Sequence, residues 1–149
     1  MVEALKLIVL SFTASAGFGI LFRIVGSDIL LAGLGGGLTR AVFLLAMALV
    51  PHRGAFTLIA AMFAAFYAEY LAVRKKVPST RFLYPAIIPL IPADLLYYVM
   101  RAVLTEDSAA FVSNGRNLAW GLTGLCVGFV AASTVVFYTR QYRAAKAGR

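Results

Sequence analysis

Charged residues are scarce in this chain of 149 residues: they make up 13% of it, and only 6 are Asp or Glu. Hydrophobic residues make up 62%. A soluble domain is typically about 25% charged and about 45–50% apolar. The composition therefore excludes a water-soluble globule of this size. It also excludes intrinsic disorder, which requires low hydrophobicity.

Cysteine and histidine are almost absent. The single cysteine, Cys126, lies within an apolar run and has no partner for an intrachain disulfide. The single histidine, His52, stands in a turn without metal-ligating neighbours, so we expect no metal site and no cofactor. No Ser, His and Asp set and no suitably spaced pair of carboxylates occurs in one region, so we expect no enzymatic activity.

Long apolar runs fill the sequence instead. A membrane-spanning helix needs about 20 apolar residues, and lipid offers no partner for open backbone groups, so such runs must be helices. We expect an all-α integral membrane protein with about five transmembrane helices. Residues 1–138 would form a single membrane domain, followed by a basic cytoplasmic tail over 139–149. The expected spans are about 4–25, 29–50, 55–73, 82–104 and 117–138.

The first run imitates a secretory signal peptide, because Ala14-Ser15-Ala16 resembles a cleavage site. However, Glu3 weakens the positive start, and the apolar run continues past the site to Ile24. We interpret it as a retained first span.

Basic residues lie mostly between the apolar runs, which indicates membrane topology rather than nucleic-acid binding. With five spans, most of the 14 Lys and Arg residues fall on one side, which the positive-inside rule assigns to the cytoplasm. We therefore expect an N-terminus outside and a C-terminus inside a plasma or inner membrane. If the second run does not cross, four spans remain and the N-terminus moves inside. The residues on the basic side are Arg23, Arg74, Lys75, Lys76, Arg81, Arg140, Arg143, Lys146 and Arg149.

Small residues recur at helix-packing intervals in the second and last runs: Gly33, Gly36 and Gly37, then Gly124 and Gly128. Small residues let helix backbones approach closely where no hydrophobic effect drives them together. The pattern predicts packing within the bundle, and it leaves open a sliding surface or a partner interface.

Two charges fall near the centres of spans. Arg40 is central in the second run and Asp94 in the fourth, at similar depth. A charge at the bilayer centre costs about 2.5–3.5 kcal/mol on insertion scales, so we expect both to face the protein interior. They form either a structural ion pair or a substrate or proton site. Glu69, near the end of the third run, is either an anchor to nearby Lys and Arg residues or part of a proton path.

The fourth run carries Pro85, Pro89 and Pro92 within eight residues. Each proline removes a backbone donor and clashes with the carbonyl four residues earlier, so a straight helix is excluded. The break either kinks a structural helix or forms a midplane substrate site, as in transporters. The carbonyl groups of Tyr84, Ala86 and Ile88 would then be open to a ligand. Tyr97 belongs either to the interfacial aromatic belt or to the same cavity.

These residues resemble a known family. The motif Ile87-Ile88-Pro89-Leu90-Ile91-Pro92, with Tyr97 five residues later, is similar to the proline motif of the threonine/serine exporter family, in particular its small-subunit or C-terminal-half type. The glycine run before Thr39-Arg40, the pair Gly17-Phe18 and the basic loop before the prolines also fit. The resemblance extends from about Ala14 to Tyr138.

The resemblance implies five spans and proton-driven export of small hydroxy amino acids, with some relatives linked to dicarboxylates. It also implies a larger membrane subunit as partner. One departure is that the family usually has Gly after the second proline, where this chain has Ala93 and then Asp94. Asp94 then favours either an amine-bearing substrate or a different coupling to protons.

The sequence thus favours an exporter subunit that lies in lipid, binds a small amino acid, and assembles with a larger subunit or with further copies of itself. It also leaves alternatives open. One is a membrane scaffold or accessory subunit that does not transport, and another is a homo-oligomeric channel with Arg40 in an anion pore.

Overall fold

A computed structural model of the chain describes residues 2–147, with the side chains of residue 140 and residues 142–147 left aside. Within that part all regular elements are helices, joined by short turns, and there is no strand. Its elements are α1 (Val2–Leu21), α2 (Asp28–Leu49), α3 (Arg53–Lys75), α4 (Thr80–Ile87), the 3₁₀ turn η1 (Ile88–Leu90), α5 (Ala93–Leu104) and α6 (Ser108–Ala147).

Four of these helices are long and apolar enough to cross a membrane: α1, α2, α3 and the part of α6 from Ser108 to Thr139. Segment α4–η1 and helix α5 together form a fifth candidate span, bent by 46° between Leu90 and Ala93. The expectation of an all-α membrane protein with about five spans is confirmed. The turn before α6 is short, at residues 105–107. Of the expected tail over 139–149, only residues 148–149 lie wholly outside the described residues.

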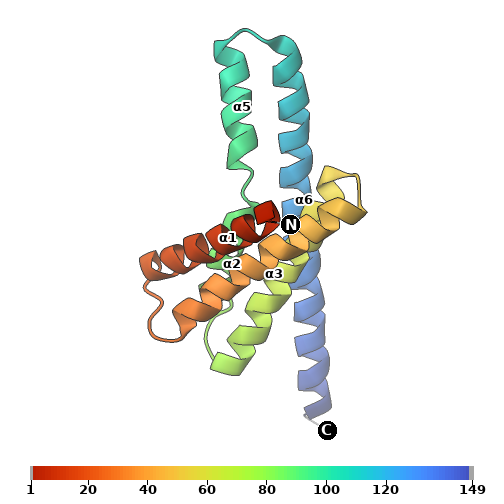
Figure 1. Cartoon of the computed structure of the whole chain (residues 1–149). Helices are drawn as coiled ribbons and strands as arrows, with labels where there is room; N and C mark the ends of the chain where they lie inside the picture. The colour runs from red at the N-terminus through yellow and green to blue at the C-terminus, as the bar shows by residue number, and fades with distance from the viewer. Residues whose placement is uncertain (1, 148–149) are drawn as a thin grey trace.

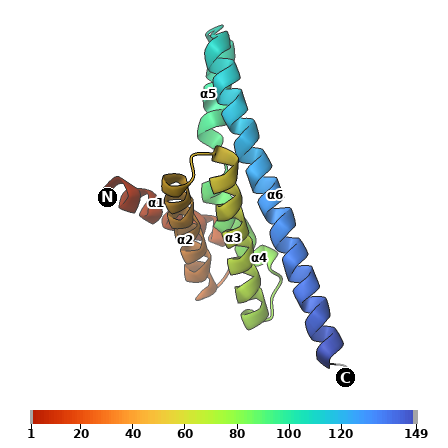
Figure 2. The same cartoon turned by 90° about the vertical axis from the view of Figure 1, so that its right-hand side faces the viewer.

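The helices form a bundle from which one hairpin projects (Figures 1 and 2). Helices α1, α2 and α3 follow one another as antiparallel neighbours, and α3 packs along α6. Helix α4 packs against α2 and α3, whereas α5 packs mainly on the first part of α6. The hairpin of α5 and α6 therefore extends beyond α1, α2 and α3, as both views show.

Glycines of α2 allow α1 to approach closely. A Cβ atom on Gly36 would overlap the Ser15 side chain, and one on Gly33 would lie 2.9 Å from the Phe12 ring. Gly37 faces α1 as well, with the Phe12 Cβ 3.4 Å away from such an atom. Close approach of this kind provides the van der Waals contact that holds helices together in lipid.

Helix α6 makes the corresponding contact with α3. A Cβ atom on Gly124 would overlap the backbone of Gly54, and one on Gly128 would lie 2.8 Å from the Leu58 carbonyl oxygen. Beside this crossing, His52 and Trp120 pack edge to face with ring centroids 5.0 Å apart. The long helix is thus held to the bundle at two adjacent backbone contacts.

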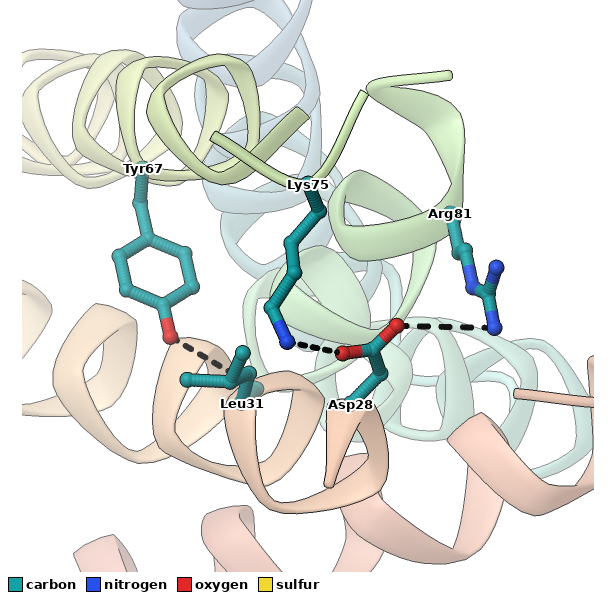
Figure 3. A network of polar contacts seen from close by, with 5 residues as sticks. All are labelled: Asp28, Leu31, Tyr67, Lys75 and Arg81. Carbon is teal, nitrogen blue, oxygen red and sulfur yellow. Dashed lines mark hydrogen bonds and ion pairs between the residues drawn. The ribbon is translucent and has the colours of Figure 1, made fainter. Parts of the chain in front are cut away.

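A polar network closes the end of the bundle where α2 begins and α3 ends. The Asp28 carboxylate pairs with Lys75 of α3 at 2.9 Å and with Arg81 of α4 at 3.6 Å. One turn further into α2, the Tyr67 hydroxyl donates a hydrogen bond of 2.7 Å to the Leu31 carbonyl oxygen. Figure 3 shows these groups from three helices converging on the first turns of α2. The Asp28 side chain is only 15% exposed, so the pairing compensates a largely desolvated carboxylate.

Replacing Gly124 with alanine should loosen the α3–α6 crossing. Alanine is favoured over glycine in a helix by about 1 kcal/mol, but here its Cβ displaces backbone, and such overpacking costs about 1–3 kcal/mol. The matched control is Gly115→Ala in the same helix, where a Cβ meets nothing within 4 Å. We expect a lower thermal unfolding midpoint in detergent for Gly124→Ala and an equal or higher one for Gly115→Ala. Equal midpoints for both variants would contradict the contact.

Asp28→Asn should destabilise the bundle by about 1–3 kcal/mol, because two cations lose their shared partner. The control is Glu3→Gln, which breaks the exposed pair between Glu3 and Lys6 and should cost less than about 1 kcal/mol. Thermal unfolding in detergent, monitored by the loss of helical circular dichroism, compares the two. Similar midpoints for both variants would show that the network adds nothing to stability.

Candidate functional site

The fourth segment is broken at Ile91 and Pro92. Ile91 is extended, at φ −65° and ψ 118°, and Pro92, at φ −81° and ψ 57°, stands just before α5. The Ala93 amide donates to the Ile91 carbonyl oxygen at 2.8 Å across this residue, as in an inverse γ-turn. Pro92 has no amide with which to continue the helical hydrogen bonds, so the next helix starts anew at Ala93.

Arg40 reaches this break from the middle of α2. Its Nη1 donates a hydrogen bond of 3.4 Å to the Pro89 carbonyl oxygen. Its guanidinium carbon lies 5.1 Å from the centroid of the Phe43 ring, in cation–π contact. The Nε atom is buried and has no hydrogen-bond partner. The guanidinium therefore retains hydrogen-bonding capacity in a half-buried position.

Asp94 lies on the first turn of α5, directly after the break. Arg40 and Asp94 line the same pocket. No direct ion pair joins them among the residues that the structure describes, and Asp94 is exposed to the pocket and its surroundings. The two charged side chains thus share one pocket without forming a direct ion pair.

The pocket has a volume of about 510 Å³, which is within the range of small-molecule sites. It lies towards the α2–α3 turn, at the opposite end of these helices from the Asp28 network. Phe43 and Phe56 meet edge to face beside it, with centroids 5.1 Å apart. Its lining residues are Leu7, Arg40, Phe43, Leu44, Met47, Arg53, Phe56, Thr57, Pro89, Leu90, Ile91, Pro92, Asp94 and Gly121.

The remaining candidate residues divide between this pocket and other places. Pro89 and Pro92 line it together with Arg40 and Asp94. Tyr97 is not among its lining residues: its side chain is 62% exposed, and its ring packs against Tyr98 at 5.6 Å. Glu69 lines two separate pockets between α3 and α6, of about 370 and 530 Å³.

The structure changes two details of the site. The carbonyl that meets Arg40 is that of Pro89, and the Ile88 carbonyl, expected to be open, instead accepts the Ile91 amide at 3.3 Å. Sequence reasoning also missed Arg53, which falls between the expected second and third spans, although Arg53 begins α3 and lines the pocket. The repeated spacing of Arg40 to Phe43 and of Arg53 to Phe56, on either side of one turn, could have indicated it.

A bundle of apolar spans with a half-buried arginine at a broken helix is an arrangement that membrane transporters use. The protein is thus of the multi-pass membrane transporter class. Within that class, the sequence profile of the threonine/serine exporter (ThrE) family matches residues 7–135, and the chain belongs to this family. This confirms the resemblance seen in the proline motif, and a transport family is consistent with a protein that is no enzyme. Neither the curated proteins nor the solved structures contain a match.

The two positions Tyr97 and Arg40 should differ in their effect on transport. Tyr97→Phe should leave efflux within about twofold, because the hydroxyl makes no contact in the pocket and the ring contact with Tyr98 is retained. Arg40→Gln should reduce efflux by at least about tenfold, since one charge-assisted hydrogen bond is worth about 1.5–3 kcal/mol. Both are measured as amino-acid efflux normalised to the amount of protein in the membrane. A strong loss in Tyr97→Phe would mean that its hydroxyl belongs to the transport path.

Proposed function

We propose that the chain is a subunit of a proton-coupled secondary exporter of threonine and serine, working by alternating access around the Arg40–Asp94 pocket. The observation that carries the proposal is the hydrogen bond from Arg40 to the Pro89 carbonyl at the break, with Asp94 lining the same pocket. Transporters place substrates at such broken helices near the bilayer midplane.

The pocket offers both halves of amino-acid recognition. A guanidinium binds a carboxylate through paired, charge-assisted hydrogen bonds, and Arg40 has an unpartnered Nε. A carboxylate such as Asp94 attracts a substrate ammonium group, and the first amides of α5 add positive potential for the substrate carboxylate. The Thr57 hydroxyl, which lines the pocket and donates to the Arg53 carbonyl oxygen, can in turn accept a bond from a substrate hydroxyl group.

Asp94 is the proposed proton-carrying group of the pocket, because a carboxylate at a midplane site is the usual relay in pumps and transporters. Glu69 is the proposed second acid on the path. It lines the cavities between α3 and α6, in the half of α3 that ends at the basic α3–α4 turn. The two acids would then serve opposite sides of the membrane.

The α5–α6 hairpin supports a partner. Helix α5 packs mainly on α6, and large apolar side chains of both helices remain exposed on the hairpin. Because the hairpin extends beyond α1, α2 and α3, its apolar side chains are left to contact lipid or another membrane helix. They are Leu96, Met100, Val103, Leu104, Phe111 and Val112. We propose that a larger subunit of the exporter, or a further copy of this chain, lies against this hairpin. The same observation favours the alternative function, a scaffold that stabilises a partner without transporting.

In the membrane, residues 1–138 would form one domain, with the N-terminus outside and the tail over 139–149 in the cytoplasm. The Asp28 network supports this orientation, because it places the α1–α2 and α3–α4 turns at one end of the bundle. These are the turns that carry the excess of basic residues. The pocket then lies nearer the outer side.

Threonine efflux tests the proposal. Cells without their own exporters are loaded with a threonine-containing dipeptide and express this chain with or without a larger family subunit. We expect efflux that collapses with a proton uncoupler and is lost in Arg40→Gln and in Asp94→Asn, both of which still insert. Efflux that persists at full rate with an uncoupler would contradict proton coupling and indicate a channel.

The double variant Arg40→Gln/Asp94→Asn separates an exporter from a scaffold. If the two charges bind substrate, the double variant should be as inactive as either single one, with normal assembly. If they only hold helices together, each single variant should lower the amount of assembled protein, and the double variant should partly restore it. Recovery of assembly without any effect on efflux would contradict the proposed site.

A further inference from the structure

Arg53 adds a second guanidinium to the pocket. It is half-buried at the first turn of α3, and it lines the pocket together with Arg40 and Asp94. Its Nε lies under Gly121 of α6, 3.7 Å from where a Cβ would stand. Its guanidinium makes no hydrogen bond or ion pair with any other residue whose side chain is described. An arginine packed in this way and left without a partner has its full donor set available to a ligand.

The two arginines occupy equivalent positions on neighbouring antiparallel helices. Arg40 stands three residues before Phe43 on α2, and Arg53 stands three residues before Phe56 on α3. The two phenylalanine rings meet edge to face at 5.1 Å. Each arginine is thus a near neighbour, on its own helix, of one ring of this pair, and both arginines line the same pocket. Two guanidinium groups on different helices can each bind a different group of one ligand.

The charges of the pocket do not balance. Its lining contains two cations and one carboxylate, so a zwitterion with no net charge leaves one cation without a partner. An unpaired charge is costly in a site of low polarity. A ligand with two carboxylates and one ammonium group would pair each of the three.

We infer that the pocket accepts acidic amino acids, with Arg53 as the residue that selects their second carboxylate. Arg40 binds the carboxylate nearer the break, Asp94 binds the ammonium group, and Arg53 binds the other carboxylate at the mouth. The inference rests on the proposed transport site, and it extends the substrate range from hydroxy amino acids to aminodicarboxylates. Serine and threonine would use Arg40, Asp94 and Thr57, and would make no contact with the Arg53 guanidinium.

Equilibrium binding to the full chain in lipid nanodiscs tests this. The probes are L-aspartate, L-serine and succinate, titrated by calorimetry at one salt concentration. We expect L-aspartate to bind about tenfold more tightly than L-serine, which corresponds to one additional charge-assisted contact. Arg53→Gln should remove this advantage and leave L-serine binding within about twofold. Succinate should bind more weakly than L-aspartate, because it offers Asp94 no ammonium group.

Arg116→Gln is the matched control, since Arg116 is an exposed arginine of α6 outside the pocket. It should change none of the three affinities. Equal losses for aspartate and serine in Arg53→Gln, succinate binding as tightly as aspartate, or no aspartate binding by the folded wild type would each overturn the inference. Proton-coupled threonine efflux combined with equal affinities for serine and aspartate would overturn the inference and retain the proposed function. Aspartate selectivity without any efflux would support the inference and contradict the export function.

Discussion

The structure depends on a mutual compensation between a charged side chain and a broken backbone. Three prolines within eight residues deprive the fourth segment of helical hydrogen bonds, and lipid cannot replace them. Arg40 would be costly at mid-span if it stood alone. In the fold, its guanidinium donates to the Pro89 carbonyl, and the Phe43 ring covers it. Each feature reduces the cost of the other, and together they create a polar position within an apolar bundle.

This position requires helices that approach closely. Gly33, Gly36 and Gly37 bring α1 against α2, and Gly124 and Gly128 bring α6 against α3. Larger residues there would separate the helices that surround the pocket. Packing and site formation are therefore connected, since the α3–α6 contact also positions α3, which carries Arg53, relative to α6, on which α5 with Asp94 packs.

The two ends of the bundle differ in character. The pocket lies towards the α2–α3 turn, whereas the other ends of these helices are tied by Asp28, Lys75 and Arg81 and by the hydrogen bond from Tyr67 to Leu31. Lys75 and Arg81, two basic residues of the α3–α4 region, both pair with Asp28.

The sequence by itself determined that the protein is helical and crosses a membrane, and that the fourth span is irregular. These conclusions follow from composition, from run length and from the missing amide of proline, all of which are local properties. Which groups meet was decided only by the tertiary structure. The choice of the Pro89 carbonyl, the position of Tyr97 outside the pocket, the pairing of Asp28 and the inclusion of Arg53 all depend on helix rotation and crossing. These are set by close contacts between segments far apart in the chain, which no local pattern records.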